Sequence, residues 1–145
     1  MTAPAVLRFT IPGPPVGKAR ARTIVNRGRV HSYTPNKTTA YESTVRLAFT
    51  AAYPGHVPLD GPLAVSVRAF FWPPDRYRHQ TGIESIPHTT RPDGDNVLKA
   101  VADAGNGVIW RDDSIVARWT IEKWYSLTPR VEVEIHHHEQ AGVPG

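Results

Sequence analysis

Leu63-Ala64-Val65-Ser66-Val67-Arg68-Ala69-Phe70-Phe71-Trp72 stands near the middle of this 145-residue chain. The stretch is rich in β-branched and aromatic residues, and every second side chain from Leu63 to Phe71 is apolar, which predicts a well-buried strand. Pro73 and Pro74 end it, because proline cannot donate to a sheet ladder. A buried strand of this kind needs neighbouring strands and covering helices, which the flanking segments supply.

Two regular elements are predicted before this strand. Residues 6–11 alternate between apolar and polar side chains, the period of a half-buried strand. Residues 35–52 carry apolar side chains at helical spacing and begin at Thr34-Pro35, an N-cap followed by proline in the first turn. Between them we expect a basic loop or irregular hairpin around residues 26–29.

Four segments are predicted after the buried strand. Residues 73–94 lack periodicity and predict a long surface loop, whereas residues 95–104 predict a short helix. Residues 116–124 and 130–136 alternate, and we expect them to form an antiparallel hairpin. The whole order predicts a single α+β domain, in which a mixed sheet of four or more strands carries two main helices.

Composition limits what this domain can be. A hydrophobic content of 40% and a charged content of 21% are typical of one globular domain with a real core, expected over about residues 6–136 with a frayed tail at 137–145. The absence of cysteine excludes disulfides, thiolate catalysis, Cys-ligated zinc and iron–sulfur clusters. No apolar run reaches the roughly 20 residues of a membrane span, so we expect a cytoplasmic protein without a membrane partner.

The charge is unevenly distributed. Residues 1–46 hold eight basic residues and one acidic residue, a net charge of +7, whereas the rest of the chain has a net charge of −3. A cluster of bases around glycine and proline indicates a polyanionic partner, although a basic surface kept for solubility gives the same pattern. The basic arm, residues 18–29, supplies the candidate phosphate contacts, which are Lys18, Arg20, Arg22, Arg27 and Arg29.

The strongest chemical signal is Arg91-Pro92-Asp93-Gly94-Asp95-Asn96-Val97-Leu98-Lys99. Asp93 and Asp95 lie two residues apart where a loop meets a helix, and two converging carboxylates raise each other's pKa unless a cation offsets their charge. Mg²⁺ or Mn²⁺ suits such oxygen ligands. In the alternative, one aspartate caps the helix and the other is exposed.

Further polar residues complete an acidic segment over residues 91–114. Lys99 and Asp103 follow Asp95 at one-turn intervals, which predicts either an exposed ion-pair ladder or an ammonium group beside a metal. Asp112 and Asp113 lie at the start of a later strand, where they are turn residues or bring a third carboxylate to the first pair.

The combination of motifs resembles the RusA family of Holliday junction resolvases. The likeness spans roughly residues 6–135 and depends on the joint occurrence, in this order, of three motifs. They are Ile11-Pro12-Gly13-Pro14-Pro15 with the bases that follow it, residues 91–104 with their D-x-D-N-x-x-K-A core, and Val108-Ile109-Trp110-Arg111-Asp112-Asp113-Ser114-Ile115-Val116.

The resemblance implies a RusA-like fold and a homodimeric, Mg²⁺-dependent endodeoxyribonuclease that cuts four-way DNA junctions by paired nicks, in recombination and repair. It assigns Asp93, Asp95 and Asp113 as the catalytic, metal-holding carboxylates and Lys99 as a catalytic lysine. Asp103 and Asp112 have no clear role. Gly94, where the family often has an apolar residue, and residues 75–90 depart from the pattern.

Two other functions agree with parts of this pattern. A catalytically silent junction-binding protein would keep the basic arm and use the acids for folding. A nucleotide-sugar transferase would use the D-x-D pair to hold a metal and a diphosphate, but no nucleotide-binding βαβ unit is visible in the sequence.

Overall fold

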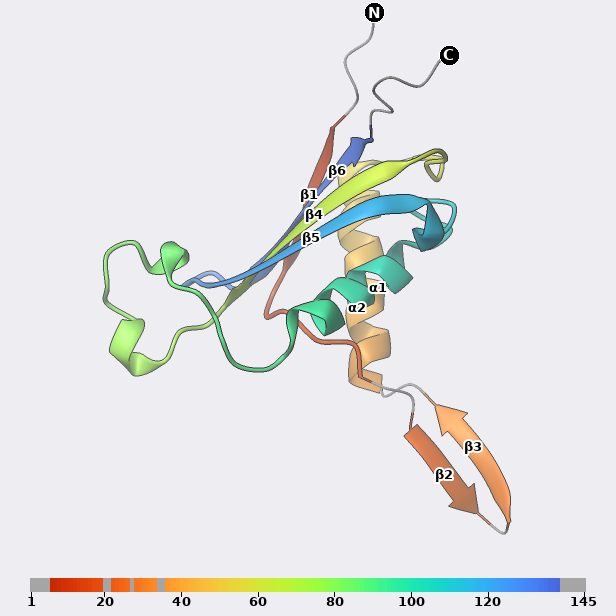
Figure 1. The fold of residues 1–145 in the computed structure, drawn as a ribbon, viewed down its shortest axis with the longest axis horizontal. Helices are drawn as coiled ribbons and strands as arrows, with labels where there is room; N and C mark the ends of the chain where they lie inside the picture. The colour runs from red at the N-terminus through yellow and green to blue at the C-terminus, as the bar shows by residue number, and fades with distance from the viewer. Residues whose placement is uncertain (1–5, 20–21, 27, 34–35, 139–145) are drawn as a thin grey trace, which may run out of the picture.

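The fold is built on a mixed four-stranded sheet (Figure 1). A computed structural model describes residues 6–19, 22–26, 28–33 and 36–138. The strands are ordered β1-β6-β4-β5, where β6 is antiparallel to both β1 and β4, and β5 is parallel to β4. Their bounds are Leu7–Pro12 for β1, Leu63–Phe71 for β4, Val116–Tyr125 for β5 and Arg130–His137 for β6. The predicted α+β class with a mixed sheet is confirmed.

Strand β4 presents an unbroken apolar face to the core and carries Ser66 and Arg68 on its other face. Leu63, Val67 and Ala69 are fully buried, and Phe70 and Phe71 are also buried although they point to opposite faces. A strand with a fully buried face is most stable with a neighbour on each side, because its backbone N–H and C=O groups then find partners. The buried strand predicted from the sequence is therefore the one that pairs with both β6 and β5.

The predicted antiparallel hairpin between the last two strands is wrong. Strands β5 and β6 do not pair, because β4 lies between them. The connection at residues 126–129 crosses the end of β4, where the backbone N–H of Ser126 donates to the carbonyl of Phe71 over 2.8 Å. Alternation of side chains marks a strand but does not choose its partner, and the apolar β4 occupies the inner position in this sheet.

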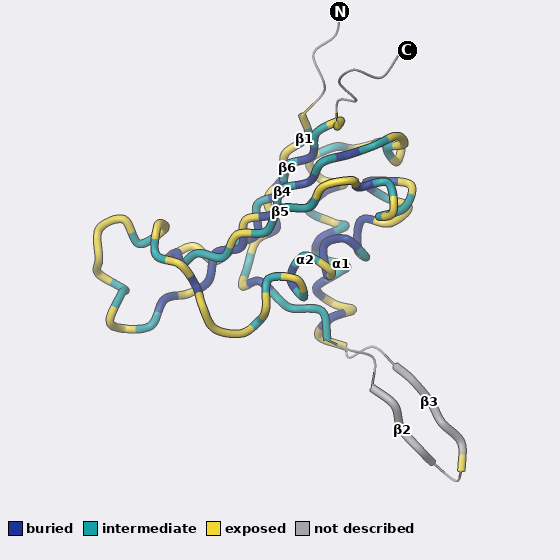
Figure 2. Tube along the Cα trace, in the orientation of Figure 1, coloured by how far each residue is buried: buried dark blue, intermediate teal, exposed yellow. Residues whose placement is uncertain are grey.

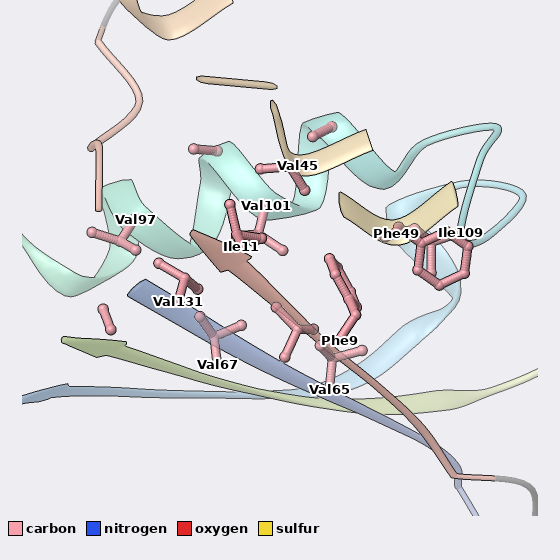
Figure 3. Close-up of a cluster of buried hydrophobic side chains, with 14 of the residues drawn as sticks. Phe9, Ile11, Val45, Phe49, Val65, Val67, Val97, Val101, Ile109 and Val131 are labelled. Carbon is pink, nitrogen blue, oxygen red and sulfur yellow. The ribbon is translucent and has the colours of Figure 1, made fainter. Parts of the chain in front are cut away.

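Two helices cover one face of the sheet: α1, Asn36–Ala52, and α2, Gly94–Gly105. Figure 3 shows apolar side chains from both helices, from the sheet and from the segment after α2 converging on one core. Val45 and Phe49 of α1 and Val97 and Val101 of α2 are fully buried there. None of the described helices is long and apolar enough to cross a membrane.

A separate hairpin projects from the core next to the start of α1 (Figure 1). It consists of β2, Arg22–Asn26, and β3, Arg29–Tyr33, which pair only with each other. Gly28, with φ of +78°, makes the tight turn between them. The expected N-cap pair Thr34-Pro35 lies outside the described residues.

The connection from β4 to α2 is the long surface loop that the sequence predicts. It is mostly exposed (Figure 2) and contains only two short 3-10 turns, Asp75–Tyr77 and Ile83–Ser85. At the other end of the chain, β6 includes His137, and the backbone N–H of His138 donates to the carbonyl of Pro62. The chain is thus ordered one or two residues beyond the predicted core, and residues 139–145 lie outside the described part.

Candidate functional site

The start of α2 presents two carboxylates to solvent. Asp93 is the N-cap residue, in an extended conformation with φ of −66° and ψ of 148°, and its carbonyl accepts the N–H groups of Asn96 and Val97. Its side chain makes no capping hydrogen bond, and both Asp93 and Asp95 are exposed. The alternative in which the Asp93 carboxylate caps the helix is therefore not observed, and both carboxylates are open to ligands.

Lys123 of β5 holds the loop that precedes this pair. Its ammonium donates to the carbonyls of Thr90 and Pro92, each over 2.8 Å. Hydrogen bonds from a charged donor are stronger than neutral ones, so Lys123 fixes the backbone immediately before Asp93. Sequence reasoning missed this residue. The sequence did contain a sign of its role, because Lys123 lies on the same strand face as the apolar Trp119 and Ile121.

The segment after β1 also contacts this loop. A Cβ atom on Gly17 would lie 2.7 Å from the Cβ of Pro92, so only glycine fits there. The next residue, Lys18, donates its backbone N–H to the carbonyl of Asn96 over 2.8 Å. The proline-rich segment of the N-terminal motif thus serves to position the start of α2.

The Lys18 side chain joins the two helices. Its ammonium lies 2.7 Å from a Glu42 oxygen and 3.1 Å from an Asp103 oxygen, and the three side chains are 18%, 14% and 30% exposed. Burial alone would lower the pKa of Lys18, but its hydrogen bonds to Glu42 and Asp103 raise it, and the net pKa lies above the usual value. Asp103 pairs with Lys18 and not with Lys99, so the expected ladder along α2 is not formed. Two carboxylates already neutralise the Lys18 ammonium that was expected to contact phosphate.

The remaining residues of the basic arm belong to the projecting hairpin or its ends. Arg22 and Arg29 lie on β2 and β3, where Arg22 pairs with Tyr33 and Arg29 with Asn26. Arg20 and Arg27 lie outside the described residues. The assignment of these four arginines to phosphate contact stays a prediction.

A groove of about 760 Å³ runs beside Asp93. Its walls come from residues 15–19, from Lys37 and Thr38 at the start of α1, and from residues 91–93 with Asn96. Lys37 and Arg91 are both exposed. A groove with two exposed cations, besides the ion-paired Lys18, and one carboxylate suits a polyanion whose phosphate lies close to that carboxylate. Sequence reasoning did not single out these two cations, although Lys37 falls in the basic N-terminal segment and Arg91 opens the acidic motif.

Asp113 lies at the opposite end of α2. Its backbone N–H donates to the Asn106 side chain over 2.7 Å, just beyond the last turn of the helix. Twelve residues of α-helix span about 18 Å, so one chain does not bring Asp113 to Asp93. Asp112 accepts the backbone N–H of Ser114, and hydrogen bonding from Ser114 lowers the Asp112 pKa.

The described part of the chain contains no group of three or more metal-ligating side chains. The donor chemistry of Asp93 and Asp95 nevertheless fits a hard divalent cation, because both carboxylates are exposed and neither forms an ion pair with a described residue. One chain supplies two of the three expected carboxylates at this end of α2. Lys99, one turn beyond Asp95, is also exposed and forms no ion pair with a described carboxylate.

Comparison with known proteins places this site in a known family. The family model for endodeoxyribonuclease RusA matches residues 12–136, a span that holds the groove and both acidic positions. The chain belongs to the RusA family. This RusA-family chain is also similar to the uncharacterized protein YqaN of Bacillus subtilis (strain 168), with 33% identity over 137 residues, 89% of this chain and 94% of that protein. Membership supports a Holliday junction resolvase nuclease that binds branched DNA.

Proposed function

We propose that this RusA-family protein resolves four-way DNA junctions by paired, divalent-metal-dependent hydrolysis of phosphodiester bonds, in DNA recombination and repair. The observation that carries the proposal is the pair of exposed carboxylates, Asp93 and Asp95, of which Asp93 lines a groove that also presents Lys37 and Arg91. A phosphate drawn into the groove by the two cations would lie next to the carboxylates.

Asp93 and Asp95 would hold the metal ion, Mg²⁺ or in its place Mn²⁺. Such an ion polarises a phosphoryl oxygen and lowers the pKa of a bound water. The role of the chain is to keep these two carboxylates in place through Lys123 and Gly17, which fix the loop before them. Lys99 is exposed one turn away and would stabilise negative charge on the phosphate.

A homodimer would complete the site. Asp93 and Asp113 lie at opposite ends of α2, so a two-fold axis that sets two copies of this helix antiparallel would place the start of one beside the end of the other. The partner subunit's Asp113 would then join Asp93 and Asp95. Strand β5 lies at an edge of the sheet on the α2 side, where a second copy has access. Two such sites fit two nicks in one junction.

Nicking of a synthetic four-way junction, compared with a linear duplex of the same sequence, tests the proposal. We expect symmetric nicks in the junction with Mg²⁺, none with a chelator, and none from the Asp93→Asn variant. Full nicking by Asp93→Asn with normal Mg²⁺ dependence would disprove the assignment.

A catalytically silent junction-binding protein is the second candidate. It is favoured by one observation, the lack of a three-carboxylate cluster within the described part of one chain. Junction binding that is unchanged by Mg²⁺ and never followed by nicks, at protein concentrations where a dimer forms, would support this second function instead of the first.

A further inference from the structure

A second hollow, of about 350 Å³, lies on the exposed connection that precedes α2. Three ring side chains contribute to its walls, together with two prolines, a cation and a hydroxyl. The lining residues are Trp72, Pro73, Pro74, Arg76, His88, Thr90 and Tyr125. Aromatic walls with few polar groups are typical of a site for a flat organic ligand.

Trp72 offers this hollow an exposed ring. It is 53% exposed, which is unusual for the largest side chain, and no aromatic ring stacks on it in the described part of the chain. The Arg78 guanidinium lies 5.3 Å from the centre of the indole, and Arg78 is in turn held by an ion pair with Asp75. The cation–π contact favours this position of the ring and occupies only one of its faces.

The ring of His88 forms part of the wall of the same hollow. The residue is only 7% exposed, and its ring stacks on the Phe71 ring with the ring centres 3.8 Å apart. Its Nε2 contacts the Thr90 hydroxyl over 3.3 Å, but its Nδ1 has no hydrogen-bond partner among the described residues. Because the ring is stacked on Phe71 and packs edge-on with Tyr125, it forms a fixed wall of the hollow.

The hollow is close to the carboxylates at the start of α2. Thr90 lines it, and the Lys123 ammonium joins the Thr90 carbonyl to that of Pro92, the residue before Asp93. Three residues of extended chain span at most roughly 11 Å, and stacked nucleotides of one strand are separated by about 3.4 Å. A phosphate at Asp93 and a base in the hollow therefore lie within about three nucleotides of each other.

We propose that this hollow receives an unstacked nucleobase of the branched DNA, within about three nucleotides of the phosphate that is cut. The base stacks on Trp72 and lies against the ring wall formed by His88 and Tyr125. Arg76, which lines the hollow and forms no ion pair with a described carboxylate, contacts the adjoining phosphate. The inference rests on the proposed junction nuclease and gives a role to the 75–90 segment, which departs from the family pattern. Bases at the branch point of a junction are the least stacked, so the site favours junctions over duplex.

Fluorescence anisotropy of a labelled junction, with a chelator present to prevent cutting, measures the contribution of the ring. Base stacking on an aromatic side chain is equivalent to a change of roughly 5- to 150-fold in affinity. We expect Trp72→Ala to weaken junction binding by about 10-fold and duplex binding by less than 2-fold, and Trp72→Phe to restore most of the loss. Leu47→Ala is the control, since Leu47 is an exposed apolar side chain of α1 that does not line the hollow.

A scan of single abasic sites across the branch point identifies the base itself. For the unaltered protein, one or two abasic positions are expected to weaken binding by the same factor as Trp72→Ala. The Trp72→Ala variant is expected to be insensitive at those positions, because the partner of the missing base is already gone. A flat scan with the unaltered protein, or equal losses of junction and duplex affinity in Trp72→Ala, overturns the inference while the preference for junctions over duplex still stands. Loss of that preference in the unaltered protein overturns the proposed function, and the inference with it.

Discussion

The two ends of α2 differ in almost every respect. At the C-terminal end, Ala104 and Gly105 are buried against Trp110, which is fully buried and donates its indole N–H to the Ala102 carbonyl over 3.3 Å. At the N-terminal end, Asp93 and Asp95 are exposed and make no capping bond. The first end is closed by side-chain packing, whereas the second is held only through its backbone and the loop before it.

This difference shows how one helix serves both stability and chemistry. Burial at the C-terminal end contributes to the core, so that changes there should alter the free energy of unfolding. Carboxylates at the N-terminal end contribute little to the fold, so that changes there should alter cleavage alone. The predictions below are ordered from the largest expected effect on stability to the smallest, and they separate residues that hold the fold from residues that serve cleavage.

Gly105→Ala should have the largest effect on stability. An added Cβ would lie 2.5 Å from the Trp110 ring, which cannot move within the core. Overpacking of this kind costs about 3 kcal/mol, measured as the free energy of unfolding in urea. Trp110→Phe in the same chain frees space, so the double variant should be less destabilised than the sum of the two single variants. Additive effects would show that the ring does not limit Gly105.

Lys18→Met should destabilise the fold and leave the salt dependence of DNA binding unchanged. Removing the ammonium leaves Glu42 and Asp103 close together and partly buried, at a cost of about 2 kcal/mol. Arg29→Gln is the comparison, because loss of one phosphate contact lowers the slope of log affinity against log salt by about 1. If Lys18→Met lowered that slope and kept full stability, Lys18 would contact DNA and would not serve as a link between the helices.

Lys123→Met should reduce nicking more than it reduces stability. Without the two bonds to the Thr90 and Pro92 carbonyls, the loop before Asp93 loses its fixed position. We expect a roughly 10-fold lower nicking rate and a loss of about 1 kcal/mol in unfolding free energy. Arg118→Gln, which removes an exposed cation from the same strand, is the control. A Lys123→Met variant that nicks as fast as the control would mean that the loop needs no anchor.

The helices and strands were predictable from the sequence, but the pairing of the strands and the long-range side-chain contacts were not. The alternating patterns marked β5 and β6, yet they could not show that β4 separates these strands. The spacing of Asp95, Lys99 and Asp103 indicated a ladder of ion pairs along the helix. The Asp103 carboxylate instead pairs with Lys18, which lies 85 positions earlier in the chain. Local patterns report periodicity and local chemistry, whereas partners distant in sequence depend on the packing of whole elements.

The candidate site shows the same limit. The sequence singled out Asp93 and Asp95, and the structure places both in the open at the start of α2. Nothing in the sequence indicated the roles of Lys123 and His88, which depend on contacts across the sheet and its long loop. The family resemblance assigned Asp113 as a catalytic carboxylate, but it did not show that an entire helix separates Asp113 from Asp93 and Asp95.

His88 should give the smallest effect, a pH dependence of stability. Burial first, and then the positive charge of Lys123, lowers the pKa of His88 from its usual 6.5. Below about pH 6.5 the unfolded chain therefore binds more protons than the folded one, and the free energy of unfolding falls as the pH drops. Urea titrations between pH 7 and pH 5 should show a steeper loss in the unaltered protein than in His88→Phe. Parallel losses would place His88 in a more solvated position.

Nicking and unfolding measured side by side for Asp93→Asn and Gly105→Ala test the division of α2 most directly. Asp93→Asn is expected to stay within about 0.5 kcal/mol of the unaltered stability and to lose at least about 100-fold in the nicking rate of a four-way junction. Gly105→Ala is expected to unfold at lower urea and still nick when folded. An Asp93→Asn variant that unfolds more easily and nicks normally would contradict the account.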